Sequence, residues 1–285
     1  MYTHQVSSLK IQVSIICAMA TMAMSAMGGE AGLDVKAQAA FDPSDAPKSH
    51  SFGSLAFQGP WGYDRPENAM RSYPLLVSGF WNEGSDHYAA VSQTYPAFVL
   101  SYQKDAEADG RFLGHWITNA IAAGYRIDLN RVYLTGFSRG GSGSFPLARG
   151  MHEAGRHFAG IIRGAGQSQP DLGNAIAEKT AVWYHIGLTD GPTRVAIARE
   201  ALGLNRCYAF NREAVESQTS DTLTGYTRTT VTLTRAGRPM FRYSEYVGMG
   251  HISAPLYKDP ALFAWLFDCA LTPVQTNAPT EVVFR

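Results

Sequence analysis

A serine between two glycines is the residue best suited to nucleophilic chemistry in this sequence. Residues 135–141 read TGFSRGG and contain the pattern Gly136-x-Ser138-x-Gly140. An apolar run at residues 132–134 predicts a buried strand before the pattern, and residues 142–149 can form a helix after it. A sharp turn between strand and helix would hold the serine hydroxyl above the sheet. Only glycine fits beside such a tight turn, because a Cβ would clash there. The alternative is that residues 136–140 form an ordinary glycine-rich turn with no catalytic role.

His251 is the predicted general base. Of the eight histidines, it is the one that lies far downstream of an acid at a strand end, in the loop sequence VGMGH. A glycine-flanked loop can bring an imidazole over Ser138 more easily than a helix can. The imidazole would take the serine proton and later donate it to a leaving group. A histidine in a surface loop is the alternative.

Asp190 is the predicted acid. It follows an apolar run, residues 181–186, and a short turn, so it should lie at the end of a strand. There a carboxylate would fix the tautomer of His251 and stabilise the imidazolium. A turn-forming aspartate before Gly191 is the alternative reading. Asp221 is the second candidate, in a polar segment with no strand expected before it.

Attack on a carbonyl group creates an oxyanion that needs two amide donors. The amide of Arg139 should be one, because this residue directly follows the nucleophile. The other should be Phe80 or Trp81, in the loop that follows the apolar run at residues 73–78. Phe80, Trp81 and Tyr88 are also the expected substrate contacts, whereas most other aromatic side chains are expected in the core.

Strand-like and helix-like segments alternate along most of the chain, which predicts an α/β fold with a mostly parallel sheet and helices on both faces. In such folds the catalytic and ligand-binding side chains lie beyond the carboxyl ends of the strands. The expected strands are residues 54–57, 73–78, 97–102, 132–134, 158–162, 181–186, 227–234 and 240–247, and the expected helices are 112–123, 142–149, 171–179, 193–202 and 256–269.

The chain divides into four parts by composition. Residues 1–28 predict a secretory signal peptide, because Lys10 precedes an apolar stretch, residues 11–27, that ends in small residues near Gly28. A retained membrane anchor is the alternative. Residues 29–50 indicate a flexible leader, residues 51–273 the folded domain, and residues 274–285 a loose tail. The expected location is therefore secreted or periplasmic.

Cysteines and charge add further expectations. Without Cys17, only Cys207 and Cys269 remain, and an exported chain favours a disulfide between them over two separate thiols. Lys plus Arg and Asp plus Glu both number 24, with no basic run, so neither nucleic acid nor, after signal removal, a membrane surface is an expected partner. His152 and His157 are five residues apart and should point to different helix faces, so no metal site is expected.

Three segments resemble a known family. Residues 127–141, IDLNRVYLTGFSRGG, are similar to the nucleophile region of secreted α/β-hydrolase esterases, namely the polyhydroxybutyrate-depolymerase-like, feruloyl-esterase-like and dienelactone-hydrolase-like group. Residues 182–187, VWYHIG, resemble that group's strand before the acid, and Gly250-His251 resembles its base loop. The likeness covers residues 73–267. It implies an α/β-hydrolase fold and ester hydrolysis by Ser138, Asp190 and His251 without a cofactor.

Two positions depart from the family pattern. The family usually has His-Gly before a glycine-rich oxyanion loop, whereas this chain has Ser78-Gly79 followed by FWNEG, so Trp81 is alternatively a substrate platform. Arg139 stands where Met or Gln is common. The Ser-Arg pair resembles glucuronoyl esterases, in which the guanidinium helps to hold the oxyanion. Arg139 would do likewise, bind a substrate carboxylate, or lie on a helix surface.

The function expected from these residues is an exported serine hydrolase that cleaves carboxylic esters through an acyl-enzyme on Ser138. The ester would be a small molecule or one linked to a polysaccharide or polyester. Two alternatives stay open at this point. One is a peptidase or amidase with the same three residues, and the other is an inactive binding protein that retains the fold.

Overall fold

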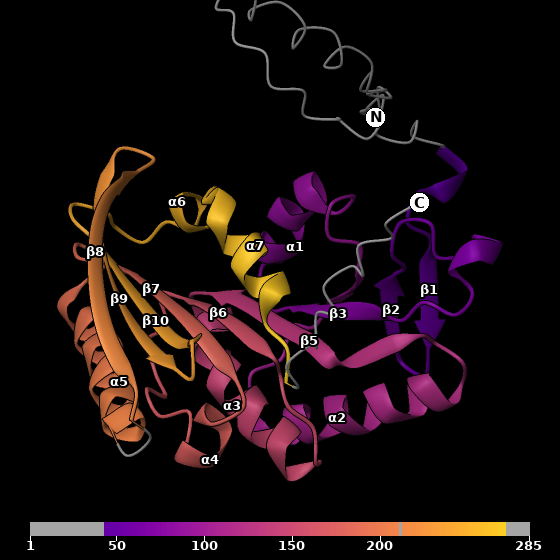
Figure 1. Ribbon diagram of the computed structural model, residues 1–285, viewed down its shortest axis with the longest axis horizontal. Helices are drawn as coiled ribbons and strands as arrows, with labels where there is room; N and C mark the ends of the chain where they lie inside the picture. The colour runs from indigo at the N-terminus through magenta and orange to yellow at the C-terminus, as the bar shows by residue number, and fades with distance from the viewer. Residues whose placement is uncertain (1–42, 211–212, 272–285) are drawn as a thin grey trace, which may run out of the picture. The chain divides into compact units, whose positions relative to one another are not determined.

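The structure is a computed structural model that describes residues 43–210 and 213–271 (Figure 1). Over these residues the strands form one sheet of ten, in the order β1-β2-β4-β3-β5-β6-β7-β10-β9-β8. The strands are β1 (Ser49–Phe52), β2 (Leu55–Gln58), β3 (Tyr73–Ser78), β4 (Phe98–Ser101), β5 (Ile127–Phe137), β6 (Gly160–Gly164), β7 (Ala181–Gly187), β8 (Val215–Leu223), β9 (Tyr226–Arg235) and β10 (Arg238–Tyr246). The helices are α1 (Glu83–Tyr88), α2 (Glu107–Ala122), α3 (Arg139–Glu153), α4 (Asn174–Ala177), α5 (Pro192–Phe210), α6 (Ala254–Tyr257) and α7 (Pro260–Asp268), with short 3-10 turns at Pro43–Asp45, Pro66–Asn68 and Ala89–Val91.

The centre of the sheet is parallel and covered on both faces. Strands β4, β3, β5, β6, β7 and β10 pair in parallel, and every residue of β3, β6 and β7 is buried. Continuous apolar runs such as YPLLVS of β3 are typical of strands with helices on both sides. Helices α2, α3, α4 and α5 lie on one face, and α1, α6 and α7 lie on the other (Figure 1). The predicted architecture, a mostly parallel sheet between helices, is confirmed.

Antiparallel strands extend both sides of this parallel centre. The β1–β2 hairpin joins β4 on one side, and β9 and β8 continue from β10 on the other. Strand β1 begins at Ser49, so the folded part starts before residue 51, where the expected domain begins. Strand β8 was not expected. Its residues are exposed on both faces, so the alternation of apolar and polar residues that marks a half-buried strand is missing.

Asp221 therefore lies within strand β8. The sequence had placed it in a polar loop instead. Its carboxylate accepts hydrogen bonds from Arg228 on the neighbouring strand β9.

The single closing helix expected over residues 256–269 is instead two helices, α6 and α7. Proline at position 260 begins α7, and the carboxylate of Asp259 accepts from the amide of Ala261 at 2.9 Å, so the chain caps a new helix there.

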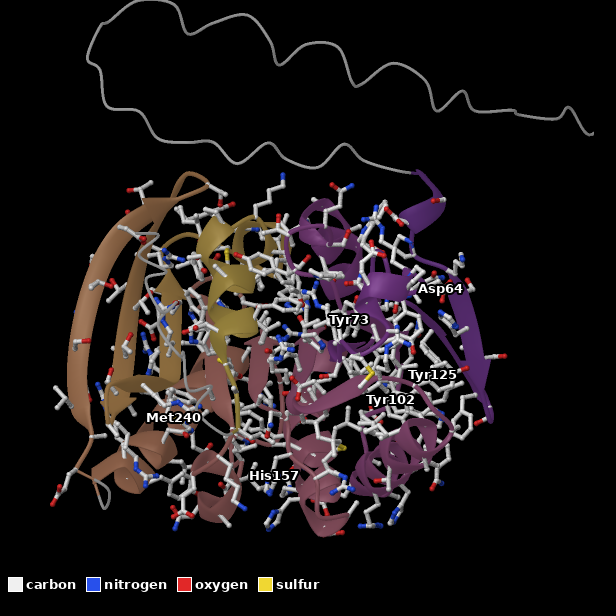
Figure 2. All side chains as sticks on the ribbon, turned by 45° about the vertical axis from the view of Figure 1, so that its right-hand side comes forward. Asp64, Tyr73, Tyr102, Tyr125, His157 and Met240 are labelled. Atoms are coloured by element: carbon white, nitrogen blue, oxygen red, sulfur yellow. The ribbon has the colours of Figure 1, made fainter. Side chains whose placement is uncertain are left out.

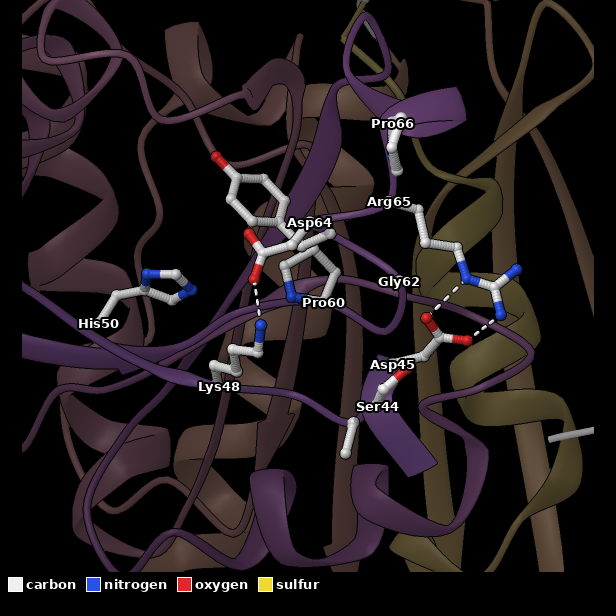
Figure 3. A pocket seen from close by; sticks show the side chains of 11 residues that line it. Ser44, Asp45, Lys48, His50, Pro60, Gly62, Asp64, Arg65 and Pro66 are labelled. Atoms are coloured by element: carbon white, nitrogen blue, oxygen red, sulfur yellow. Dashed lines mark hydrogen bonds and ion pairs between the residues drawn. The ribbon is translucent and has the colours of Figure 1, made fainter. Parts of the chain in front are cut away.

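The N-terminal segment of the described chain is fixed by two ion pairs. Figure 3 shows them beside a cavity of about 310 Å³. The Arg65 guanidinium binds the Asp45 carboxylate, and Lys48 Nζ lies 2.6 Å from Asp64 Oδ2. The hydrogen bond from Lys48 holds the pKa of Asp64 below its ordinary value. Residues 43–50, which the sequence assigned to the flexible leader, thus have specific contacts with the loop that follows β2.

The predicted disulfide between Cys207 and Cys269 is contradicted, because both are free thiols. Cys207 is exposed on α5, whereas Cys269 is buried at the end of α7, on the other face of the sheet (Figure 1). The Cys269 thiol donates to the carbonyl oxygen of Trp265 at 3.3 Å, and burial raises its pKa to about 12. Two cysteines separated by a sheet cannot meet the short Cα distance that a disulfide requires.

The expectation for His152 and His157 is also wrong in its geometry. Helix α3 ends at Glu153, so His157 is not on the helix, and the two rings approach with their centroids 5.0 Å apart. Figure 2 shows His157 near the lower helices of that view. Burial, together with nearby Lys179 and His152, lowers the pKa of His157 to about 4.

Several expectations concern residues outside those described. They are the signal peptide at residues 1–28 with Cys17, most of the leader at residues 29–50, and the tail at residues 274–285. Among the described residues, no helix combines the length and the apolar character needed to span a membrane.

Candidate active site

Ser138 and Asp190 each lie within hydrogen-bond distance of His251. Nε2 of His251 is 2.9 Å from Oγ of Ser138, and Nδ1 of His251 is 2.9 Å from Oδ2 of Asp190. The Asp190 side chain is only 1 % exposed, whereas that of His251 is 35 % exposed. The imidazole thus connects a buried carboxylate to a hydroxyl that faces the surface. We call these three residues the Ser–His–Asp cluster.

The order of the strands explains why the cluster forms. Ser138 follows β5, Asp190 follows β7, and His251 follows β10. Strands β5, β6, β7 and β10 are consecutive and parallel in the sheet, so their carboxyl ends meet at one edge. The loops after β7 and β10 are also joined directly, because the amide of Thr189 donates to the carbonyl oxygen of Met249 at 3.0 Å.

The turn that carries Ser138 has the strained geometry that the sequence predicted. Ser138 has φ 55° and ψ −114°, a region that side-chain-bearing residues rarely adopt. Its amide donates to the carbonyl oxygen of Gly164 at 2.9 Å, which ties the turn to β6. A Cβ at Gly136 would lie 2.4 Å from the carbonyl carbon and oxygen of Gly140. Gly136 is therefore required by the close approach of strand β5 to helix α3, whereas a Cβ at Gly140 would meet the backbone of Phe80 in the loop after β3.

Replacing Gly136 by alanine is expected to destabilise the fold by about 3 kcal/mol, because the new methyl group overlaps backbone atoms that cannot move independently. Gly203, inside α5, is the matched control. A Cβ there meets no atom within 4 Å, so Gly203→Ala should instead stabilise the helix by about 1 kcal/mol. Urea unfolding of both variants measures the difference. Equal stabilities of the two variants would contradict this account of the turn.

The two amides that the sequence assigned to an oxyanion, those of Phe80 and Arg139, both lie at the start of helix α3. Arg139 is the first residue of α3, so its amide belongs to a helix N-terminus. The amide nitrogen of Phe80 would lie 3.0 Å from a Cβ built on Gly140, so the loop after β3 contacts the first turn of α3. Within the described chain, neither amide donates a turn, loop or cap hydrogen bond to another backbone group. Trp81 and Asn82 both have positive φ, 74° and 57°, which gives this loop its shape.

The side chain of Arg139 contacts Asp105 and the ring of Phe80. Its Nε donates to Oδ2 of Asp105 at 2.7 Å, and its guanidinium carbon lies 4.2 Å from the centre of the Phe80 ring. These contacts connect α3 to the loop before α2 and to the loop that follows β3. The guanidinium therefore packs the Phe80 loop against the start of α3.

The three aromatic residues expected to contact substrate have different surroundings. Trp81 is 60 % exposed, which is unusual for tryptophan, and its ring lies 6.4 Å from that of Phe80. Tyr88 is buried instead. Its hydroxyl donates to the carbonyl oxygen of Tyr95 at 2.5 Å, and its ring stacks on Phe267. Phe80 and Trp81 thus belong to the loop beside Ser138, whereas Tyr88 lies at the far end of α1.

A hydrogen-bond network joins the Ser138 turn to Asp190. Oγ of Ser142 donates to the carbonyl oxygen of Ser138 at 3.2 Å and accepts from the amide of Gln167 at 2.8 Å. Oε1 of Gln167 accepts from Arg194 at 2.8 Å, and Nη1 of Arg194 lies 3.4 Å from Oδ1 of Asp190. The sequence did not predict a role for Ser142, Gln167 or Arg194 in this network. Arg194 stands four residues after Asp190, the one signal by which the pair could have been found.

Arg163 is the most unusual buried residue near the site. It lies on β6, is 0 % exposed, and has no carboxylate partner among the described residues. Its guanidinium donates to Oγ of Ser144 at 3.2 Å and to the carbonyl oxygen of Ser168, and it lies over the Phe145 ring. It therefore braces α3 against the loop after β6. Burial lowers its pKa from the ordinary value.

His185 is the other histidine close to the site, and it is a core residue, as expected. Its side chain is buried on β7, and Nδ1 lies 2.9 Å from the hydroxyl of Tyr246. Burial lowers the pKa of His185 well below its ordinary value, and Arg228 and Arg242 lower it further. Among the described residues there is also no group of three or more His, Cys, Asp or Glu side chains arranged to hold a metal ion.

Comparisons with known proteins agree with this architecture. No family model matches the chain, and no curated protein sequence matches it. Among solved structures, a thermostable esterase matches with a TM-score of 0.51 and 18% identity, over 80% of this chain and 63% of that one. An acetyl xylan esterase from Aspergillus awamori matches with a TM-score of 0.50 and 15% identity, over 78% of this chain and 98% of that one.

Identities this low speak to the fold and not to a shared substrate. The chain spans less than two thirds of the length of the thermostable esterase. Its sheet, its strand–turn–helix at Ser138 and its structural neighbours agree with the resemblance found in the sequence. The chain therefore has the α/β-hydrolase fold.

Proposed function

We propose that this protein is an exported serine hydrolase that cleaves carboxylic esters through an acyl-enzyme on Ser138. The single observation that carries the proposal is the position of the His251 imidazole, 2.9 Å from Ser138 Oγ on one side and 2.9 Å from Asp190 Oδ2 on the other. A nucleophile, a base and an orienting acid in hydrogen-bond contact are the parts that acyl transfer by serine requires. Export is supported by the composition of residues 1–28.

The geometry supports the following sequence of steps. Nε2 of His251 takes the proton as Ser138 Oγ attacks the ester carbonyl carbon, and the carbonyl oxygen becomes an oxyanion. The Phe80 and Arg139 amides would donate to that oxygen. The imidazolium then protonates the leaving alcohol, and an acyl-enzyme remains on Ser138. Water, deprotonated by His251, attacks the acyl-enzyme and releases the carboxylic acid and the free serine.

Asp190 supports these steps without exchanging protons. Its carboxylate accepts from Nδ1 of His251, so Nε2 is left with the lone pair that faces Ser138. The negative charge of Asp190 also stabilises the imidazolium formed after attack. No step calls for a cofactor or a metal. The proposed substrate is a small ester or an ester group on a polysaccharide or polyester.

Labelling and a matched panel of substrates test the proposal. A fluorophosphonate probe should modify the protein once, on the peptide that contains Ser138, as determined by mass spectrometry. The protein should hydrolyse p-nitrophenyl acetate and butyrate, and the corresponding p-nitroanilides much more slowly. Turnover of the anilides at similar rates would favour an amidase or peptidase. Absence of both labelling and turnover would favour a binding protein that retains the fold.

A further inference from the structure

Arg194 contacts the carboxylate of Asp190 but takes no part in the steps described above. The Asp190 side chain is 1 % exposed, and a buried carboxylate is costly unless donors satisfy its oxygens. Nδ1 of His251 lies 2.8 Å from Oδ1 and 2.9 Å from Oδ2, so this contact does not by itself decide how the carboxylate is turned. Nη1 of Arg194 approaches Oδ1, at 3.4 Å. Arg194 therefore distinguishes the two oxygens.

The same nitrogen also contacts the main chain of Asp190. Nη1 of Arg194 donates to the carbonyl oxygen of Asp190 at 3.2 Å. Helix α5 begins at Pro192, directly after Gly191, whose φ of 95° is a conformation suited to glycine. Arg194 thus lies about one helical turn beyond Asp190. A single guanidinium holds both the backbone and the side chain of Asp190, which fixes the direction of the carboxylate relative to the end of β7.

The other terminal nitrogen of Arg194 faces the loop after β6. Nη2 donates to Oε1 of Gln167 at 2.8 Å, and the amide of Gln167 donates to Oγ of Ser142 at 2.8 Å. That hydroxyl donates in turn to the carbonyl oxygen of Ser138 at 3.2 Å. The planar guanidinium therefore contacts the loops after β6 and β7 at once. Asp190 gains a connection to the Ser138 turn that does not pass through the imidazole.

The partners of Arg194 indicate that it acts through Asp190. Both of its terminal nitrogens donate to protein oxygens, and its Nε is buried. The Arg194 side chain is 32 % exposed, compared with 57 % for that of Arg139 at the start of α3. A guanidinium engaged in this way orients the groups around it and is not directed at a substrate.

We propose that Arg194 is a positioning residue for the reaction. It holds Asp190 in the orientation that His251 needs and ties it through Gln167 to the Ser138 turn. This inference rests on the proposed function. Misplacing a reacting group by about 1 Å can lower a rate by about 10²-fold. Loss of the Arg194 guanidinium should therefore lower kcat, and KM should stay near the wild-type value because no substrate contact is removed.

Arg194→Met tests the proposal, with Arg199→Met as the matched control. Methionine keeps an unbranched apolar stem and removes the guanidinium. Arg199 lies on the same helix, is exposed, and donates to Glu245 at 2.7 Å, so its loss removes an ion pair without touching the Ser–His–Asp cluster. With p-nitrophenyl butyrate, Arg194→Met should lower kcat by about 10²-fold, and Arg199→Met should match the wild type. An unchanged kcat, with or without a raised KM, would overturn the proposal.

A double-variant cycle asks whether Arg194 acts through Asp190. In the Asp190→Asn background the carboxylate that Arg194 holds is gone, so Arg194→Met should lower kcat little further. A loss by the same factor in both backgrounds would overturn the proposal, because Arg194 would then act independently of Asp190.

Arg194→Lys is a second variant, which keeps the charge and the aliphatic stem. It should fold even where Arg194→Met does not, as circular dichroism would verify. A compact ammonium does not span Asp190 and Gln167 as the planar guanidinium does, so the kcat of this variant should lie between those of the wild type and Asp190→Asn. A wild-type kcat in Arg194→Lys would contradict the role given to the guanidinium.

Urea unfolding separates this inference from the proposed function. If the wild type hydrolyses no ester, the proposed function fails, and the unfolding free energies of the same cycle still measure the coupling of Arg194 to Asp190. The loss of stability from Arg194→Met should be smaller when residue 190 is already asparagine. Equal losses in both backgrounds would refute the contact. An active wild type with an undiminished kcat in Arg194→Met would refute the positioning role alone.

Discussion

Replacing Ser138 by alanine is expected to lower kcat for p-nitrophenyl butyrate by about 10⁵-fold, because the variant has no oxygen to form the acyl-enzyme. The methyl group of alanine occupies the position of the serine Cβ, so the strained turn at φ 55° should persist. His251 and Asp190 would keep their contact, since neither depends on the hydroxyl. The measurement is steady-state hydrolysis, with circular dichroism to verify the fold.

The wild-type protein inactivated by a fluorophosphonate is the matched comparison for this variant. Both lack a free serine nucleophile, so both should lose nearly all activity, and Ser138→Ala should take up no label. A residual rate that stays near the wild-type value would mean that another nucleophile carries the reaction. Labelling of the variant at a second serine would lead to the same conclusion.

Asp190→Asn is expected to lower kcat by about 10⁴-fold while leaving the structure intact. In the wild type, the Asp190 carboxylate accepts a hydrogen bond from Nδ1 of His251 at 2.9 Å. An amide in its place can present its NH₂ group to Nδ1, and the imidazole then carries its proton on Nε2. That nitrogen could no longer accept the proton of Ser138, and the imidazolium would lose its counter-charge. Kinetics with p-nitrophenyl butyrate measure the loss.

Asp221→Asn is the control for this substitution. Asp221 is the second acid considered from the sequence, and its carboxylate binds Arg228 between β8 and β9. Because this pair lies in the antiparallel part of the sheet, its loss should leave kcat near the wild-type value. An Asp221→Asn variant as inactive as Asp190→Asn would show that the acid was assigned to the wrong carboxylate.

Local features account for the parts of the site that sequence alone could predict. The turn at Ser138 is encoded within five residues, since glycine at position 136 allows β5 to approach α3 and glycine at position 140 allows the Phe80 loop to approach the same turn. The positions of Asp190 and His251 follow from the same kind of signal, a strand-like segment followed by a short turn or loop. The parallel sheet follows from the alternation of strands and helices, which is also a property of short segments.

Contacts between distant segments were beyond such reasoning. Asp105 binds Arg139, and Gln167 links Arg194 to the Ser138 turn, yet no short pattern marks either pairing. The expected disulfide failed for the same reason, because the sheet lies between Cys207 and Cys269. Strand β8 could not be predicted from the sequence, because an edge strand exposed on both faces has no alternation of apolar and polar residues.

The chain thus encodes each residue of the Ser–His–Asp cluster locally, with its type, its turn and its place at a strand end. Ser138 and His251 are 113 residues apart, and their distance in space depends on the order in which β5, β6, β7 and β10 pair. That order is set by backbone pairing and by the burial of whole strands between two layers of helices. It is a property of the assembled core, which no short segment of the sequence contains.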